Sequence, residues 1–555
     1  MSQVAAGSGL SDTLWFSQIA DRVLASFPSE KLYTCAAGIS PSGIVHFGNF
    51  RDVITAFAVA CELRLRGREV RLLFSWDDFD RFRKVPKDVD PKFQRYIGYP
   101  LTGVPDPWEK FESYAQRYEV EFEESMRELG IGLEYRYQTR EYRSGRYADQ
   151  ISVAMRNRAK IADIQLQFKT DKGNEERGID PGEFARTYWP IVVYSRFTGT
   201  DKTQIVDYDG GTTITYRCLA TGKSETIDYR QTPIVKLPWK IDWPMRWGAE
   251  NVNFEPGGKD HATPGGSFDV SAVISREIFA REPPVFQGYE FVGIQGSKGK
   301  MSGSSGGAVS PAMLLEIYEA RLLKWLYLRR SPTQSFNLAF DSEVIRQYDE
   351  FDREVRGLQA EGVEPFRRKV LQFSGVEAAN AADSGAAPIP FKQAVGLGQI
   401  VQWDVERVVD LEEKTGTSFS RASIERRLPK ARAWLTRYNP EEMIALLEAP
   451  NTAYARTMDA RSIQWVQRMK RFLATKPTSI ATIEAELYAI PKDASLPEKE
   501  VKALQRKFFK DVYKLLIGKE TGPRLATFLW ASQRGDGDRA TVERLLDLES
   551  TWTGG

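Results

Sequence analysis

The chain has 555 residues, of which 27% are charged, and its 77 lysines and arginines nearly balance 75 aspartates and glutamates, for a formal net charge of +2. One hydrophobic core rarely grows to this length, so we expect two to four domains, and the balanced charge does not favour a uniformly basic nucleic-acid protein. The three cysteines (Cys35, Cys61, Cys218) are too few and too scattered for a disulfide scaffold or a four-thiolate zinc site, and they fit a reducing compartment, so we expect a cytoplasmic protein.

Residues 1–30 are predicted to form a polar tail and a helix from Ser11 to Phe27, which Ser11 or Asp12 caps and Pro28 ends. This segment lacks the charged and apolar regions of a signal peptide. No stretch of the chain approaches the roughly 20 apolar residues of a membrane span. We therefore expect no membrane association.

A βαβ unit is predicted next. Residues 31–39 (KLYTCAAGI) and 69–76 (EVRLLFSW) have the composition of buried strands, and between them a Gly/Pro turn leads into a helix over residues 50–67. Such a unit makes its two strands parallel, with a right-handed crossover. It predicts a doubly wound, Rossmann-like α/β catalytic domain over residues 31–335.

This α/β pattern is interrupted over about residues 85–240. Residues 106–130 and 146–169 have helical periodicity, whereas residues 199–230 alternate polar and apolar side chains around glycine turns, as antiparallel hairpins do. We therefore predict an inserted α+β subdomain within the catalytic domain.

Beyond the insertion, the α/β pattern resumes over residues 249–267 and reaches a strand at residues 289–294. Helical periods dominate from residue 310 onward. We expect a helical connection and linker over residues 336–390, in which residues 374–390 are rich in alanine, serine and glycine, and an all-helical region over residues 391–555.

The two common nucleotide-binding signatures are absent. Arg217 replaces the first glycine that a Walker loop would need before Gly222-Lys223-Ser224, and no G-x-G-x-x-G fingerprint opens a βαβ unit.

The turn before the helix of the βαβ unit is the first candidate phosphate site. A helix N-terminus presents unpaired N–H groups to anions, glycines let the backbone approach them, and His46 and Asn49 can donate hydrogen bonds. The alternative is an ordinary turn with a core histidine. We prefer the functional reading because His46 is one of only two histidines, and we include Pro41, Gly43 and Gly48 in the site.

The polar loop over residues 297–306 is the second candidate. Its small residues allow movement, and Lys298 and Lys300 carry charge that could close over a triphosphate. Standing alone, the segment would be read as a solvated Gly/Ser loop.

The two candidates together resemble a known signature pair. H-x-G-N after the first strand, followed by K-M-S-x-S after the last, resembles the class I aminoacyl-tRNA synthetases. The segments GISPSGIVHFGNFRDVITA, DDFDRFRKVP, LPWKIDWPMRW and GKDHATPGGSFD resemble, in this order, the class I lysyl-tRNA synthetases. The resemblance extends from about Tyr33 to Arg353, with weaker matches at PIPFKQAV and GPRLATFL.

The resemblance implies a ligase that activates lysine with ATP and Mg²⁺ and transfers it to tRNA(Lys), with no obligatory protein partner. It implies catalytic roles for His46, Asn49 and Lys300. The ATP contacts that it implies are Pro41, Gly43, His46, Gly48, Asn49, Lys298, Lys300, Met301, Ser302 and Ser304. The family usually has a second lysine in the K-M-S loop, where this chain has Gly303 and Ser305, and Lys298 is the nearby substitute.

The resemblance also implies a lysine pocket. Its members would be Gly38, Ser40, Asp77, Trp239, His261 and Tyr289. A carboxylate and aromatic rings suit an ammonium group. Two alternatives stay open: Trp239, Trp243 and Trp247 have the spacing of a core stripe, and Asp77, Asp78 and Asp80 could be solvated loop charges.

Two further parts of the family pattern concern metal and RNA. The family commonly has paired C-x-x-C knuckles in the insertion, where this chain has Ser195-x-x-Thr198 and Cys218-x-x-Thr221, so we expect no zinc and interpret Cys218 as the remnant of a lost site. The helical region would bind the anticodon. Basic and aromatic residues interleave in residues 420–438, and the candidates there are Arg426, Arg427, Lys430, Trp434 and Arg437. An amphipathic helix with a solvated basic face is the alternative.

Two rival functions remain open from the sequence. One is a class I synthetase of another amino-acid specificity, and the other is a catalytically weakened RNA-binding paralogue, which Gly303 and Ser305 would favour.

Overall fold

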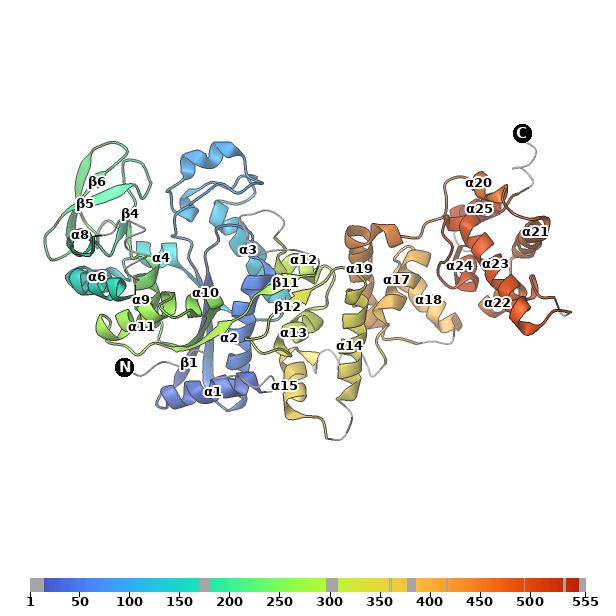
Figure 1. Ribbon diagram of the computed structural model, residues 1–555, viewed down its shortest axis with the longest axis horizontal. Coiled ribbons are helices and arrows are strands. Elements are labelled where there is room, and N and C mark those ends of the chain that lie inside the picture. The colour runs from blue at the N-terminus through green and yellow to red at the C-terminus, as the bar shows by residue number, and fades with distance from the viewer. Residues whose placement is uncertain are drawn as a thin grey trace. The chain divides into compact units, whose positions relative to one another are not determined.

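The computed structural model describes residues 14–168, 180–295, 308–358, 360, 362–376, 386–415, 418–493, 495–532 and 536–548. The chain folds into two compact units (Figure 1). The first comprises Met1–Leu315, Ala320–Ala339 and Ala360–Gly375, and the second comprises Glu316–Glu319, Phe340–Gln359 and Val376–Gly555.

A five-stranded parallel sheet, in the order β10-β9-β1-β2-β3, is the centre of the first unit. Its strands are β1 (Leu32–Ile39), β2 (Glu69–Trp76), β3 (Glu134–Tyr137), β9 (Val252–Gly258) and β10 (Val285–Tyr289). The predicted βαβ unit is confirmed, because β1 and β2 pair in parallel from Leu32–Glu69 to Ile39–Trp76. Strands β2 and β3 lie on one side of β1, and strands β9 and β10 lie on the other side. The direction in which strands are added therefore reverses between β1 and β9.

Helix α2 (Phe47–Leu65) connects β1 to β2 and is almost entirely buried against the sheet. It starts where the turn after β1 ends and is capped by His46. Helix α1 (Trp15–Ser26) packs on α2, and its Phe16 ring stacks on Phe366 of α15 (Pro365–Phe373) at 5.4 Å. The predicted caps Ser11 and Asp12 lie outside the described residues.

The insertion contains helices and small antiparallel sheets, as the pattern indicated. Strands β5 (Thr203–Tyr208), β6 (Thr213–Cys218) and β7 (Ser224–Asp228) form an antiparallel sheet, and β4 (Val192–Val193) pairs with β8 (Val235–Lys236). Its helical elements are η1 (Pro91–Tyr96), η2 (Leu101–Gly103), α3 (Tyr114–Glu128), α4 (Gln138–Arg143), α5 (Ala148–Arg156), α6 (Arg158–Gln167) and α8 (Pro181–Thr187). Strand β3 lies inside this stretch of sequence but belongs to the central sheet. It was not predicted, because it has only four residues and a polar pattern.

The predicted strand over residues 289–294 is wrong as a single element. β10 ends at Tyr289, and β11 (Val292–Ile294) instead pairs with β12 (Phe336–Leu338), a strand that was not predicted. The other elements of this part are α9 (Trp239–Ala249), α10 (Lys259–Ala262), α11 (Ser267–Glu277), α12 (Pro311–Leu315) and α13 (Ala320–Leu328).

The second unit is helical throughout its described residues. Its elements are α14 (Glu343–Gly357), α17 (Phe391–Ile400), α18 (Val405–Thr415), α19 (Arg421–Tyr438), η3 (Pro440–Glu442), α20 (Thr452–Ala455), α21 (Ala460–Ala474), α22 (Ile480–Ala489), α23 (Glu498–Ile517), α24 (Leu525–Ser532) and α25 (Asp536–Leu545). Among the described helices of both units, none is long and apolar enough to cross a membrane.

Candidate functional site

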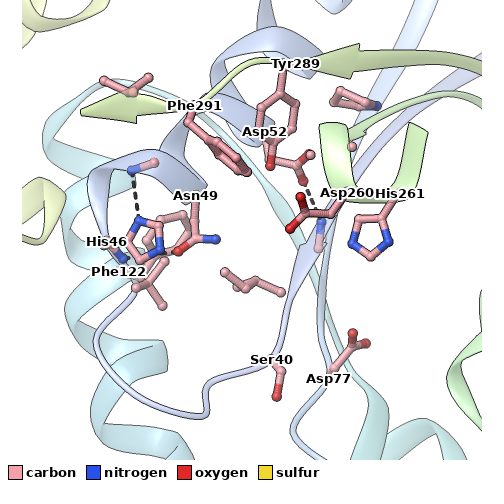
Figure 2. A pocket seen from close by; sticks show the side chains of 18 of the residues that line it. Ser40, His46, Asn49, Asp52, Asp77, Phe122, Asp260, His261, Tyr289 and Phe291 are labelled. Carbon is pink, nitrogen blue, oxygen red and sulfur yellow. Dashed lines mark hydrogen bonds between the residues drawn. The ribbon is translucent and has the colours of Figure 1, made fainter. Parts of the chain in front are cut away.

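A cavity of about 710 Å³ opens at the carboxyl edge of the central sheet. Its walls include the ends of β1, β9 and β10, so it lies where the strand order reverses, the usual ligand position in an open α/β sheet. Figure 2 shows His46 and Asn49 on one side of this space, Asp260 and His261 on another, and Ser40 and Asp77 on a third. Every lining residue belongs to the first unit.

The start of α2 forms the first wall, and a capping box fixes its two polar side chains. His46 Nδ1 accepts a hydrogen bond from Gly48 N–H at 3.1 Å, and Asn49 Oδ1 accepts one from His46 N–H at 3.3 Å. Both side chains thus use an acceptor within the cap. The imidazole Nε2 and the Asn49 amide nitrogen are then the donor ends of these side chains, which suits an anionic ligand.

The turn itself contributes less to the cavity than the sequence suggested. Gly48, His46 and Asn49 line the cavity, whereas Pro41 and Gly43 are buried and do not. The other expected phosphate contacts, Lys298, Lys300, Met301, Ser302 and Ser304, lie outside the described residues, as do Gly303 and Ser305.

The six residues expected around lysine all line this same cavity: Gly38, Ser40, Asp77, Trp239, His261 and Tyr289. Asp77 already has a cationic partner, because Arg246 Nη1 lies 2.7 Å from its carboxylate, and Arg246 Nε lies 3.3 Å from Asp242. Burial raises the pKa of Asp77 to about 6, although Arg246 opposes this shift. Asp77 is therefore part of a buried ion-pair network and does not offer its whole charge to a substrate.

Neither neighbour of Asp77 is a solvated loop charge. Asp78 is 2% exposed and accepts a hydrogen bond from Thr139 N–H at 2.7 Å. Asp80 pairs with the buried Lys236 at 2.5 Å. Asp77, Asp78 and Asp80 therefore all bond to other protein groups, and Asp77 and Asp80 form ion pairs with cationic side chains.

The tryptophan stripe of α9 serves both the cavity and the core. The rings of Trp239 and Trp243 stack at 4.9 Å, and the His261 ring lies 6.1 Å and 5.7 Å from them. Trp243 lines the cavity as well, although only Trp239 was assigned to it. Trp247 is in the core at 1% exposure, and the guanidinium of Arg246 lies 5.3 Å from the Trp239 ring.

Three carboxylates line the cavity that were not predicted from the sequence, namely Asp52, Glu255 and Asp260. Asp52 on α2 accepts a hydrogen bond from Gly38 N–H at 3.2 Å, and burial raises its pKa well above the ordinary value. Glu255 on β9 accepts one from Trp247 Nε1–H at 2.7 Å. The signals were present in the sequence: Asp52 lies three residues after Asn49 on one face of α2, and Glu255 comes just before the glycines that end β9.

In the insertion, the side chains of Ser195, Thr198, Cys218 and Thr221 converge. Cys218 is buried, and the Thr198 hydroxyl lies 3.8 Å from its Sγ. Burial disfavours the thiolate, but hydrogen bonds from Ser195, Thr221 and Thr198 outweigh it and lower the pKa of Cys218 to about 6. Hydroxyls are not structural zinc ligands. The described residues contain no group of three or more His, Cys, Asp or Glu side chains that could hold a metal.

Two of the five candidate RNA-binding residues are structural. Arg427 is 0% exposed and bonds to Asp352, Glu319 and the carbonyl of Ile389. Trp434 is buried and donates to the carbonyl of Phe340 at 2.9 Å. An RNA contact by these two side chains is contradicted, because RNA could reach neither without opening the core. Arg426 and Lys430 are half-buried, and Arg437 is exposed and paired with Glu316.

Comparison with known proteins gives one consistent picture. A family model described as "tRNA synthetases class I (K)" matches residues 13–374. The chain is 34% identical to the lysine–tRNA ligase of Pyrococcus horikoshii, over 96% of this chain and 99% of that protein. It is 36% identical to the lysine–tRNA ligase of Streptomyces coelicolor, over 94% of this chain and 96% of that protein.

A solved glutamate tRNA ligase from Elizabethkingia meningosepticum aligns over 93% of this chain and 99% of that chain. The TM-score is 0.44 and the sequence identity is 11%.

Proposed function

The chain belongs to the class I (K) tRNA synthetases, and from this premise we propose that it is a lysine–tRNA ligase whose reaction takes place in the cavity at the carboxyl edge of the sheet. The observation that carries the proposal is that one cavity combines the donor-rich start of α2 with a wall of carboxylates and aromatic rings. The start of α2 suits the phosphates of ATP, and the carboxylates and aromatic rings suit the ammonium of lysine.

The reaction has two steps. A carboxylate oxygen of lysine attacks the α-phosphate of ATP, and the bond to the β-phosphate breaks, which gives lysyl-adenylate and pyrophosphate. A hydroxyl of the terminal adenosine of tRNA then attacks the lysyl carbonyl, and AMP leaves. Both steps require alignment and stabilisation of negative charge more than a strong base.

In this proposal His46 and Asn49 donate hydrogen bonds to the phosphates through the ends of their side chains that the cap leaves as donors. ATP binds as its Mg²⁺ complex. Lys300, with Lys298 in place of the absent second lysine, provides positive charge for the leaving pyrophosphate, and Met301, Ser302 and Ser304 belong to the same loop. Gly38, Ser40, Trp239, His261 and Tyr289 surround lysine, and Arg246 holds Asp77 in place.

We further propose that the helical second unit binds tRNA(Lys), with Arg437 as the exposed candidate on α19. The enzyme would act in the cytoplasm without an obligatory protein partner.

The test is lysine-dependent exchange of pyrophosphate into ATP, together with charging of total tRNA, measured for each of the twenty amino acids with and without tRNA. We expect lysine alone to be activated and attached. Lys300→Ala and Lys298→Ala should each depress adenylate formation. Binding of tRNA(Lys) without formation of lysyl-tRNA would favour the non-catalytic paralogue, and charging with another amino acid would favour a different specificity.

A further inference from the structure

Some of the carboxylates that line the cavity are paired with cationic side chains, and others are not. Asp77 is paired with Arg246, and Asp80 is paired with Lys236. In the described part of the chain no lysine, arginine or histidine nitrogen forms an ion pair within 4.0 Å of Glu255 or Asp52. A charged carboxylate at the edge of a protein interior is costly without a cation, so a cationic ligand would relieve that cost.

Glu255 and Asp52 differ in how far they are exposed to the cavity. Asp52 accepts the N–H of Gly38 and also interacts with the Tyr289 hydroxyl, so it connects α2 to the ends of β1 and β10. Glu255 is more exposed to the cavity than Asp52, which is 8% exposed, and its hydrogen-bond partners are the neutral indole groups of Trp247, at 2.7 Å, and Trp243. Of the two, Glu255 is therefore the carboxylate that an ammonium group in the cavity can reach, and its oxygens can accept further hydrogen bonds.

The position of Glu255 along β9 indicates which ammonium group it would meet. Glu255 pairs with Phe286, and the strand reaches the sheet edge three residues later at Gly258, about 10 Å further along an extended chain. The start of α2, where the phosphates would bind, lies at this edge. The α-amino and carboxylate groups of the substrate must stay near the phosphates, so only the end of its side chain can reach deeper into the cavity.

We propose that Glu255 is a specificity-determining residue that binds the side-chain ammonium of lysine from the floor of the cavity. The inference rests on the lysine-binding function proposed above and adds a residue to it. Arg246 forms its ion pairs with Asp77 and Asp242 and acts on Glu255 only from beyond ion-pair distance, so Glu255 can distinguish a cationic side chain from a neutral one.

Protonation of Glu255 supports the same role. Burial raises its pKa to about 7, and the hydrogen bond from Trp243, the charge of Arg246 and the hydrogen bond from Trp247 oppose the shift. The titratable and charged groups around it are Arg246 and Asp242 on α9, Asp77 after β2, Asp52 on α2, Tyr289 on β10, and Asp260 and His261 on α10. A lysine ammonium favours the carboxylate form, so binding near pH 7 should release protons, and lysine should bind more tightly as the pH rises through about 7.

The test compares lysine with norleucine, whose side chain lacks the ammonium. In pyrophosphate exchange, Glu255→Gln should lower kcat/KM for lysine by about 10²-fold, chiefly through KM, and should leave norleucine use unchanged. Glu282→Gln, an exposed glutamate paired with Arg276, is the matched control and should change neither substrate. Thermal melting shows whether each variant is folded.

An unchanged ratio of lysine to norleucine activation in folded Glu255→Gln would overturn the inference. If that variant does not fold, the wild-type chain provides the second measurement: calorimetry in two buffers of different ionisation enthalpy should show proton release with lysine and none with norleucine, and equal release would overturn it. A wild-type chain that activates no lysine would instead contradict the proposed function itself.

Discussion

At the scale of single residues, the cavity wall at the start of α2 depends on a glycine as much as on its polar side chains. A Cβ atom on Gly48 would lie 2.8 Å from two atoms of the His46 ring, closer than real contacts allow. That ring is held by the hydrogen bond from the Gly48 N–H, so a methyl group here would displace the imidazole and break the cap.

Gly48→Ala is therefore expected to slow adenylate formation on the order of 10–100-fold, because in the proposed function His46 donates to the phosphates, and misplacing it would weaken alignment and charge stabilisation. Pyrophosphate exchange measures the effect. Gly67→Ala is the matched control: Gly67 has φ of +73° with no atom within 4 Å of a Cβ, so its substitution should cost about 1 kcal/mol of stability without changing the rate. Equal rates for the two variants would contradict this role of Gly48.

Asp78 gives a prediction about pH. Burial raises its pKa from near 3.8 to about 7, although the Thr139 N–H lowers it. The folded chain therefore keeps a proton on Asp78 that the unfolded chain loses above about pH 4. The contribution of this group to stability falls as the pH rises from about 4 to about 7, because over that range the folded state binds more protons.

Asp78→Asn keeps the acceptor for Thr139 N–H and removes the titration. We expect it to stabilise the first unit by about 1–3 kcal/mol at pH 8 relative to the parent chain, and to bring little change at pH 4. Melting temperatures at the two pH values check this. A stabilisation that is the same at both pH values would show that ionisation of Asp78 is not its cause.

At the scale of elements, hydroxyl–thiol contacts join two turns of the insertion. Ser195, Thr198 and Thr221 surround Cys218, and each pair stands in a tight turn of the antiparallel hairpins. Three of the four positions lack a thiol, so the hydrogen-bonded turns and the packing of β5, β6 and β7 must hold this subdomain together.

The parent chain should contain no stoichiometric zinc. Because the four positions already converge, Ser195→Cys, Thr198→Cys and Thr221→Cys together should create a four-thiolate site that binds about one zinc ion and raises the melting temperature. Metal analysis and melting with and without a chelator measure both. Zinc in the parent chain, or none in the triple variant, would show that the four positions do not form a knuckle.

Helix α19 shows why a basic helix cannot be interpreted from its charges alone. The sequence alone does not distinguish one arginine of this helix from another. Arg427 is 0% exposed and forms buried ion pairs with Asp352 and Glu319, whereas Arg437 is exposed. Removing the partner of two buried carboxylates is a different change from removing an exposed cation. Only the packing of α19 on α14 and α17 separates the two cases.

At the scale of the whole molecule, the chain has two units with separate cores. The whole cavity lies in the first unit, while the second has its own buried aromatic contacts, such as Tyr348 stacked on Phe391 at 4.1 Å. A ligand that binds only a folded unit stabilises that unit by mass action.

Lysine with a non-hydrolysable ATP analogue should therefore increase the free energy of unfolding of the first unit by about 2.7 kcal/mol at 100 times Kd. The melting temperature of the first unit should rise, and that of the second should not change. Differential scanning calorimetry of the full chain checks this. Equal shifts of all transitions would contradict the assignment of the whole ligand site to the first unit.

Local sequence was sufficient for the long elements and for the signature residues. The buried strands β1 and β2, the capped helix α2 and the helical second unit follow from continuous apolar runs and 3.6-residue periods, which do not depend on distant partners. The short strands β3 and β12 cannot be predicted in this way, because three or four residues form a strand only through the neighbouring strand with which they pair.

The sequence by itself therefore determined the α/β class, the position of His46 and Asn49 at a helix start, and the likeness to lysine-activating enzymes. Only the tertiary structure decided which charges are already paired. It joined Arg246 to Asp77, buried Arg427, and brought Glu255 from β9 to the floor of the same cavity. The reason is physical: burial and ion pairing join residues that are far apart in the sequence, 169 positions for Arg246 and Asp77, and they determine whether a carboxylate is satisfied by the protein or remains for a substrate.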